Sequence, residues 1–359
     1  MMRNLMKLNY ILSLTAAMLM AVAGADRPAT AASNQQDTRP LRSRTDDKRA
    51  TQQDVIKESD ETLRLDVDLV DVVFTVVDRN NRLVPGLKQE QIELLENGAP
   101  QEIDYFEQNT NVPMIIALVI DVSGSQEFVL SQEKDAAESF FRSVFREGKD
   151  YAAIVTFRGD TYLAQGLTSD LKRLADSIRR IRRERIFRAD EGLQSSGTSL
   201  YESIYLTIDE ILEGKTARRV IGSDEVKRHA IRRAMILLTD GQDTTSQRSE
   251  KEAIDRANRS GVIIYSIGIG DNFRFGEVNT RALEELCRQT GGRAYFPQSE
   301  SDLRKAFDQI VEELSSQYVL AYRPSNKAQD GSFRNIDIRI RGVDGLQVIH
   351  RKGYFARGR

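Results

Sequence analysis

Hydroxyl and carboxylate side chains occur in three short segments that could together hold a metal ion. Residues 121–125 read DVSGS, residues 196–200 read SGTSL, and residues 238–241 read LTDG. The candidate ligands that they supply are Asp121, Ser123, Ser125, Thr198 and Asp240. All of these side chains offer hard oxygen ligands, which suit Mg²⁺, Mn²⁺ or Ca²⁺ and not Zn²⁺. The segments therefore predict a divalent-cation site, with Mg²⁺ as the first choice of cation.

The neighbouring sequence predicts that these segments meet at one edge of a sheet. Residues 113–121 (PMIIALVID) and 234–239 (AMILLT) are continuous apolar runs, which are typical of strands buried on both faces of a parallel sheet. Asp121 and Asp240 come at the ends of these runs, and Thr198 opens a helical pattern. In open α/β sheets, ligands bind beyond the carboxyl ends of the strands. We therefore expect the three segments to lie close together.

The central part of the chain alternates strand and helix patterns. Strands are predicted at residues 113–121, 151–157, 234–239 and 262–269. Helices are predicted at residues 133–146, 171–181, 200–212, 252–259, 281–289 and 302–314. Such alternation indicates the α/β class, with a mostly parallel sheet and helices on both faces.

Strand patterns without helices flank this region. Before it, a β-branched run covers residues 72–77, and Asn97-Gly98 is a strong hairpin signal. After it, strands are predicted at residues 318–322, 336–340 and 346–349. Neither flank has enough strands to form a stable domain by itself. We therefore predict that residues 61–110 and 317–359 pair into a small β-sandwich, with the α/β domain, residues 111–316, inserted between them.

The N-terminus has the pattern of an export signal. A basic start precedes an apolar run at residues 10–22, and residues 23–25 (AGA) read as a cleavage site. The run is shorter than the ~20 residues that a membrane-spanning helix needs. We therefore predict a cleaved signal peptide, residues 1–25, no transmembrane span in the mature protein, and a periplasmic or extracellular location. Residues 26–60 are polar and are predicted to be a disordered linker.

The overall composition does not indicate nucleic acid as a partner. The formal net charge is −2, and 30% of the residues are charged with balanced sign. The basic runs at 179–188 and 227–233 are more typical of solvated surfaces, although an acidic partner surface is an alternative. Cys287 is the only cysteine, so it forms no internal disulfide, and we expect it to be a small buried hydrophobe. We expect His229 and His350 at the surface.

The motifs DVSGS, SGTSL and LLTDG, in this order, resemble the metal-ion-dependent adhesion site of von Willebrand factor A (VWFA) domains. The resemblance covers about residues 112–316 and implies the Rossmann-like fold of that family. The flanking segments, including VDVVFTVVDRNNRLVPGL and QYVLAYRPSN, resemble a secreted bacterial group of VWFA-related domain proteins, first grouped in acidobacteria. One departure is Ser196-Gly197, where the family usually has two glycines before the threonine.

The resemblance also implies a role for each candidate ligand. Ser123 and Ser125 would bind the cation directly, and Thr198 would bind it directly or through water. Asp121 and Asp240 would act mainly through water or through hydrogen bonds to the direct ligands. With mostly neutral direct ligands the cation keeps positive charge, and the Asp or Glu carboxylate of a protein partner is the natural group to replace one of its waters.

These features predict a non-enzymatic, exported protein-binding module for adhesion or scaffolding. Two alternatives stay open. A metal-assisted hydrolase would need a general base, for which Asp240 or Asp243 is the only nearby candidate by sequence. A structural protein could instead have kept the motif without binding metal.

Overall fold

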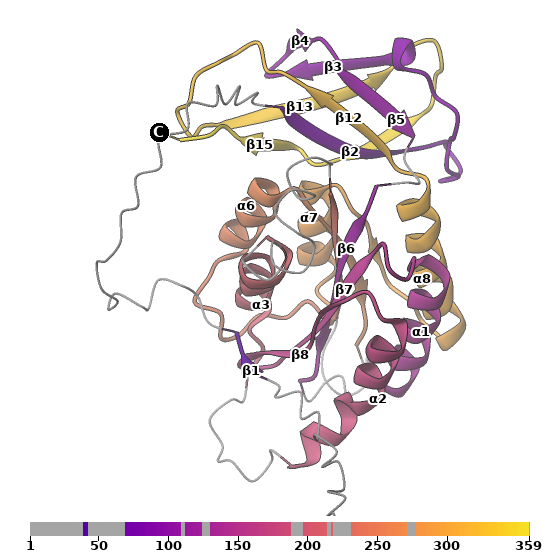
Figure 1. Cartoon of the computed structure of the whole chain (residues 1–359), viewed down its shortest axis with the longest axis vertical. Coiled ribbons are helices and arrows are strands. Elements are labelled where there is room, and N and C mark those ends of the chain that lie inside the picture. Colours follow the sequence, from indigo (N-terminus) through magenta and orange to yellow (C-terminus); the bar gives the residue numbers. More distant parts are fainter. Residues whose placement is uncertain are drawn as a thin grey trace, which may run out of the picture. The chain divides into compact units, whose positions relative to one another are not determined.

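The computed structural model describes residues 39–41, 69–108, 112–123, 130–187, 197–213, 217, 231–270 and 278–358. These residues form one seven-stranded sheet with helices and two four-stranded antiparallel sheets (Figure 1). The predicted signal peptide and most of the predicted linker lie outside them. No helix in the described ranges has the length and apolar character needed to cross a membrane.

The seven-stranded sheet has the strand order β1-β8-β7-β6-β9-β10-β11. Its strands are β1 (Arg39–Pro40), β6 (Met114–Asp121), β7 (Tyr151–Phe157), β8 (Thr161–Thr168), β9 (Arg232–Thr239), β10 (Val262–Gly268) and β11 (Ala294–Tyr295). The strands from β7 to β11 in this order run parallel, while β8 and β1 add an antiparallel edge. Strand β6 lies between β7 and β9, and every one of its residues is buried. This explains its unbroken apolar sequence.

Helices cover both faces of this sheet (Figure 1). One face carries α1 (Leu130–Val144), α2 (Leu171–Phe187) and α8 (Glu300–Ser315). The other carries α3 (Leu200–Thr207), its π-helical continuation η4 (Ile208–Leu212), α6 (Glu250–Ser260) and α7 (Thr280–Thr290). Successive residues of a strand point to opposite faces. Accordingly, Leu118 belongs to the core beneath α1, α2 and α8, and Val119 belongs to the core beneath α3, α6 and α7.

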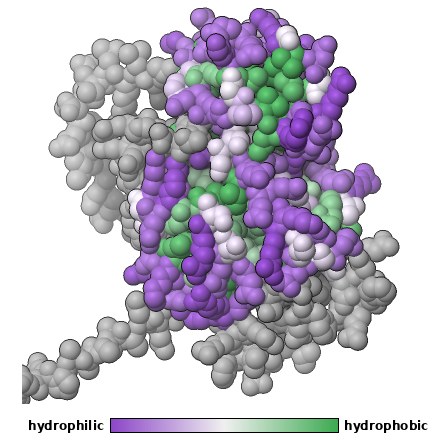
Figure 2. All heavy atoms as spheres, turned by 90° about the vertical axis from the view of Figure 1, so that its right-hand side faces the viewer, coloured by the Kyte–Doolittle hydropathy of each residue, from purple (hydrophilic) through white to green (hydrophobic). Residues whose placement is uncertain are grey.

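The helices α1, α2 and α8 are amphipathic. On α1, Phe140 and Phe141 are buried, and the ring centroid of Phe140 lies 5.4 Å from that of Phe307 on α8. Figure 2 views the molecule from the side of these helices and shows mostly hydrophilic side chains with small hydrophobic areas between them. The apolar stripes of these helices thus face the sheet, as expected for helices at the surface of a globular domain.

The other two sheets combine strands from both flanks of the α/β domain. Their orders are β14-β2-β12-β5 and β15-β13-β3-β4. The N-terminal strands are β2 (Val70–Val77), β3 (Ile92–Glu96), β4 (Ala99–Gln101) and β5 (Tyr105–Gln108), with a short 3-10 turn η2 (Gln89–Gln91) before β3. The C-terminal strands are β12 (Tyr318–Tyr322), β13 (Phe333–Ile340), β14 (Gln347–His350) and β15 (Gly353–Phe355). In particular, β12 lies between β2 and β5, and β13 pairs with β3.

A buried polar network links these two sheets. Glu96, at the end of β3, is 3% exposed and accepts hydrogen bonds from the hydroxyls of Tyr322 (2.7 Å) and Tyr354 (2.9 Å). The guanidinium of Arg334 lies 3.4 Å from the same carboxylate. A buried carboxylate is tolerated when it is paired and hydrogen-bonded in this way. The network therefore joins β3 to β12, β13 and β15.

The predicted fold class is confirmed, including the additional antiparallel strands around the α/β domain. The hairpin predicted at Asn97-Gly98 connects β3 to β4, and both of its residues have positive φ angles of 48° and 82°. Such angles are required in the two-residue turns that match the twist of the strands.

The sequence prediction did not include strands β1, β8, β11 and β15. Strand β8 was not predicted, because its sequence, TYLAQGLT, has no continuous apolar run, and its pairing with β7 contains two register shifts. Strand β1 interrupts the predicted disordered linker, so that prediction does not hold at residues 39–41. Leu41, which follows β1, is only 6% exposed and packs into the core. Pro40 is compatible with an edge strand because such a strand needs fewer N–H donors.

Candidate functional site

The parallel pairing of β6 with β9 places the ends of both strands at the same edge of the sheet. Ile120 lies opposite Leu238, so Asp121 comes next to Thr239, and Asp240 follows directly. Asp121 is 0% exposed, and Asp240 is 6% exposed. The two carboxylates are close enough for the charge of Asp240 to raise the pKa of Asp121.

The carboxylate of Asp121 organises the segment that follows it. Its Oδ1 accepts a hydrogen bond from the backbone N–H of Ser123 (2.8 Å), and the hydroxyl of Ser123 also bonds to the carboxylate. Its Oδ2 accepts one from the hydroxyl of Thr239 (2.8 Å). Burial raises the pKa of Asp121 to about 6, although these hydrogen bonds act in the opposite direction. Asp121 thus fixes Ser123 and joins β6 to β9.

The turn after β9 depends on a glycine. Gly241 has a φ of +77°, and a side chain there would meet Leu283 Cγ at 2.9 Å. Its N–H donates to the hydroxyl of Thr239 (3.1 Å), so that hydroxyl accepts from Gly241 and donates to Asp121. Asp240 is held by the backbone N–H groups of Gln242, which reaches its Oδ1 (3.0 Å), and of Asn279, which reaches its carbonyl oxygen (2.8 Å).

Thr198 is attached to the same turn by its backbone. Its N–H donates to the hydroxyl of Thr244 (2.8 Å), and its carbonyl accepts from the N–H groups of Thr244 (2.8 Å) and Thr245 (3.2 Å). Gly197 permits this approach, because a side chain there would lie 2.2 Å from Thr245 Cγ2. Thr198 is 8% exposed. The glycine directly before the threonine is therefore a steric requirement.

Helix α3 begins at this edge and is fixed to the neighbouring strand. The N–H and the hydroxyl of Ser199 both donate to the carbonyl of Arg158, which follows β7 (2.7 and 2.8 Å). Asp243 accepts hydrogen bonds from the N–H of Tyr201 (3.3 Å) and from the hydroxyl of Ser246. The carboxylate of Asp243, a candidate base in the hydrolase alternative, thus has the role of a helix cap.

Four of the five predicted ligands lie at this edge, namely Asp121, Ser123, Thr198 and Asp240, while Ser125 lies outside the described residues. The residues fit a hard divalent cation, since neutral hydroxyls lie beside two buried carboxylates whose repulsion a cation would relieve. Among the described residues, no group of three or more His, Cys, Asp and Glu side chains is placed to hold a metal ion by itself.

Sequence reasoning missed Thr239 and Glu133 as parts of this site. Glu133, on α1, is 1% exposed, and neither of its carboxylate oxygens has a hydrogen-bond partner among the residues that the structure describes. Burial, with a contribution from the charge of Asp121, raises the pKa of Glu133 to about 8. The spacing to Ala137 and Phe140 places Glu133 on the apolar stripe of α1, and this signal could have identified it.

The structure confirms the sequence prediction for Cys287 and contradicts the one for His350. Cys287 is confirmed as a buried residue at 1% exposure, and its thiol donates to the hydroxyl of Ser266 (3.2 Å). The prediction for His350 is wrong, since it is 5% exposed, with Nδ1 2.7 Å from the carbonyl oxygen of Arg351. Its position on β14, which packs near α7, was not visible from the sequence. His229 lies outside the described residues.

The comparison with known protein families agrees with this architecture. The sequence profile of the von Willebrand factor type A domain matches residues 116–309, which is more than half of the chain. The chain belongs to this family. The match begins within β6 and ends within α8, so it covers the α/β domain and the edge that carries the candidate site. Among curated proteins, none matches this VWFA chain.

Several solved structures are similar to this VWFA chain. The conserved hypothetical protein BatB from Bacteroides thetaiotaomicron has 18% identity and a TM-score of 0.41, covering 57% of this chain and 100% of that one. A von Willebrand factor type A protein from Catenulispora acidiphila has 12% identity and a TM-score of 0.43, covering 82% and 75%. Proximal thread matrix protein 1 from the mussel byssus, with a zinc-occupied MIDAS motif, has 17% identity and a TM-score of 0.44. This chain covers 50% of that mussel protein, and 61% of this chain is matched.

The buried carboxyl of Glu133 leads to a prediction about pH. Because its pKa is raised from 4.5 to about 8, the folded state disfavours the ionised form. Burial of this carboxyl costs no stability through ionisation below about pH 4.5, where it is protonated in both the folded and the unfolded state. The cost to the free energy of unfolding grows as the pH rises and is complete above about pH 8. In metal-free protein, Glu133→Gln should therefore gain stability over the wild type with rising pH, up to on the order of 3–5 kcal/mol. Urea unfolding over this pH range measures the difference.

Glu312→Gln, on the exposed side of α8, is the matched control and should follow the wild type at each pH. If Glu133→Gln also followed the wild-type pH dependence, a raised pKa of the Glu133 carboxyl would be contradicted.

Proposed function

We propose that this VWFA domain binds a divalent cation through Asp121, Ser123, Ser125, Thr198 and Asp240, and that the cation holds a carboxylate of a protein partner. The observation that carries this proposal is the Asp121 carboxylate. It is buried at the end of β6, bonds to both the N–H and the hydroxyl of Ser123, and lies beside Asp240. On this basis the protein is a binding module and not an enzyme.

The arrangement of charges supports this proposal. Both carboxylate oxygens of Asp121 already accept hydrogen bonds, one from Ser123 and one from Thr239. This suits a residue that orients the direct ligands better than a residue that itself coordinates the cation through both oxygens. The hydroxyls of Ser123 and Thr198 are neutral. A dication bound mainly by hydroxyls and water retains charge with which to attract an anionic ligand, and Mg²⁺ is our first choice. In this proposal, the protein fixes the positions of the ligand oxygens, and the carboxylates of Asp121 and Asp240 supply negative charge close to them.

The first prediction concerns the cation. After treatment with a chelating resin, the full chain should melt at a higher temperature when Mg²⁺ is added. A cation at about 100 times its Kd contributes about 2.7 kcal/mol, which corresponds to a rise in Tm of roughly 5–10 °C for a domain of this size. Asp121→Asn should lose this rise, because the variant lacks one of the two carboxylate charges. Mn²⁺, Ca²⁺ and Zn²⁺ are compared under the same conditions to identify the preferred cation.

Asp308→Asn removes the same charge from the exposed side of α8 and should keep the cation effect. The metal-free Asp121→Asn variant should melt no more than a few degrees from the metal-free wild type, so that a loss of the cation effect is separable from unfolding. The absence of a cation-dependent rise in the wild type would favour the structural alternative, in which the motif no longer binds metal.

A second prediction concerns the partner. In the presence of the preferred cation, the protein should bind immobilised peptides that contain Asp or Glu and should not bind matched peptides with Asn or Gln. A carboxylate can complete the coordination shell of the cation and add negative charge, whereas an amide is neutral. Surface plasmon resonance with wild type and Asp121→Asn measures this. Equal binding to acidic and amide peptides, or binding that persists after removal of the cation, would contradict a metal-bridged carboxylate.

We also propose that the chain is exported, and that it belongs to the secreted bacterial VWFA-related group that its flanks resemble. The support is the basic start, the apolar run at residues 10–22 and the AGA sequence at residues 23–25. Expression in a bacterial host should yield mature protein outside the cytoplasm that begins at Asp26. N-terminal mass spectrometry of the periplasmic and culture fractions measures the start. Protein that stays in the cytoplasm and still begins at Met1 would rule out the signal peptide.

A further inference from the structure

The edge strand β1 joins the α/β domain from a separate part of the chain. Residues 41–69 separate it from β2 in the sequence, and it falls outside the range that the family profile matches. Its two residues pair antiparallel with Leu163 and Tyr162 of β8. The N–H of Leu41, the next residue, donates to the carbonyl of Thr161 (3.0 Å). Strand β1 thus covers the end of β8 that lies next to the turn between β7 and β8.

The pairing of β7 with β8 is irregular next to this turn. Two register shifts interrupt it on either side of Ile154. Beyond them, Thr156 lies opposite Tyr162 and Phe157 lies opposite Thr161. Register shifts disrupt the hydrogen-bonded ladder locally. The end of β8 that leads into the turn is therefore held by a few pairs with β7 on one side and by β1 on the other.

The side chain of Leu41 anchors β1 to the domain. Leu41 is 6% exposed and belongs to the same apolar core as Phe157, the last residue of β7, and Leu200, the first residue of α3. Pro40, by contrast, is exposed. Removal of an apolar side chain from water is favourable in proportion to the area buried. A charged residue in place of Leu41 should therefore release the strand from β8.

The turn between β7 and β8 holds the start of α3. The N–H of Arg158 in this turn donates to the carbonyl of Asp160 (3.0 Å), and the carbonyl of Arg158 accepts both hydrogen bonds from Ser199. Within the described part of the chain, the side chain of Ser199 makes no cap hydrogen bond to α3, although serine often caps a helix. Thr198, a proposed cation ligand, directly precedes Ser199. The position of Thr198 therefore depends on this turn.

We propose that β1 is a positioning strand for the candidate metal site. Docking of Leu41 holds the turn between β7 and β8, and this turn holds Thr198 where it can bind the cation. Packed side chains and hydrogen bonds of this kind can couple two sites energetically. The segment that carries β1 would thereby control the affinity for the cation. This consequence rests on the proposed function, whereas the effect of β1 on the turn does not require a cation.

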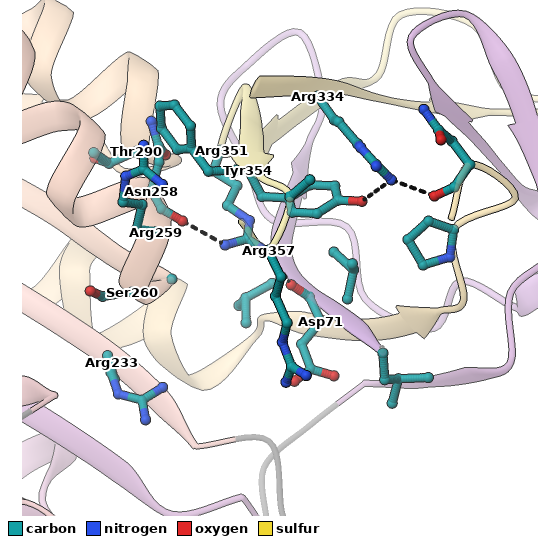
Figure 3. Close-up of a pocket in the computed structure, with 18 of the residues that line it drawn as sticks. Asp71, Arg233, Asn258, Arg259, Ser260, Thr290, Arg334, Arg351, Tyr354 and Arg357 are labelled. Carbon is teal, nitrogen blue, oxygen red and sulfur yellow. Dashed lines mark hydrogen bonds between the residues drawn. The ribbon is translucent and has the colours of Figure 1, made fainter. Parts of the chain in front are cut away.

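The experiment compares three variants of the full chain with the wild type. Leu41→Asp places a charge in the apolar core and should undock β1. Leu41→Met keeps an apolar side chain of similar volume and should behave as the wild type does. Val262→Ala is the matched control for lost packing, since Val262 is 1% exposed and belongs to the same core. It begins β10 at the opposite end of the sheet, where its neighbours Gly261 and Ile263 line a cavity of about 350 Å³ (Figure 3).

The first measurement is hydrogen exchange of the metal-free protein, followed by mass spectrometry. The amides of Arg158 and Ser199 report on the turn and on the start of α3, because both donate hydrogen bonds there. In Leu41→Asp these amides should exchange faster on the order of tenfold, since local opening exposes them without global unfolding. Leu41→Met and Val262→Ala should keep the wild-type exchange rates at both amides, even where Val262→Ala lowers the Tm.

The second measurement is the Kd for Mg²⁺, by calorimetric titration of the resin-treated proteins. Leu41→Asp should bind Mg²⁺ roughly 3- to 30-fold more weakly than the wild type, whereas Leu41→Met and Val262→Ala should match it. The proposal would be overturned if Leu41→Asp kept the wild-type exchange rates or the wild-type Kd, or if Val262→Ala accelerated exchange at the two amides equally. If the wild type bound no divalent cation, the metal function would fail, and the exchange rates alone would decide whether β1 holds the turn.

Discussion

The parallel register of β6 against β9 is the constraint on which the candidate site depends. The pairing runs from Met114 opposite Arg232 to Ile120 opposite Leu238, and it ends both strands at the same edge. Only with this register does the hydroxyl of Thr239 reach the carboxylate of Asp121. A shift by one residue would turn every side chain of a strand to the other face. Such a shift would also exchange side chains between the two helical cores, so close packing of both cores fixes the geometry of the site.

The sequence predicted those parts of the fold that have a strong local pattern. Continuous apolar runs identified β6 and β9, because strands buried on both faces need apolar residues at every position. Strand β8 has no such run, since it lies towards the edge and only four of its eight residues are buried. Strand β1 has only two residues, and its existence depends on β8, a partner far along the chain. The pairing of β12 between β2 and β5 likewise depends on contacts that no local pattern encodes.

The candidate site was predictable to the extent that its residues form local motifs. Asp121, Ser123, Thr198 and Asp240 occur in short segments whose spacing indicates oxygen ligands at strand ends. The roles of Thr239 and Glu133 depend on tertiary structure, which brings the hydroxyl of Thr239 to Asp121 and buries the Glu133 carboxyl without a hydrogen-bond partner among the residues that the structure describes. A carboxyl on an apolar helical stripe is a costly feature unless it is protonated or compensated. It is therefore a better signal of a special environment than a carboxyl on a polar face.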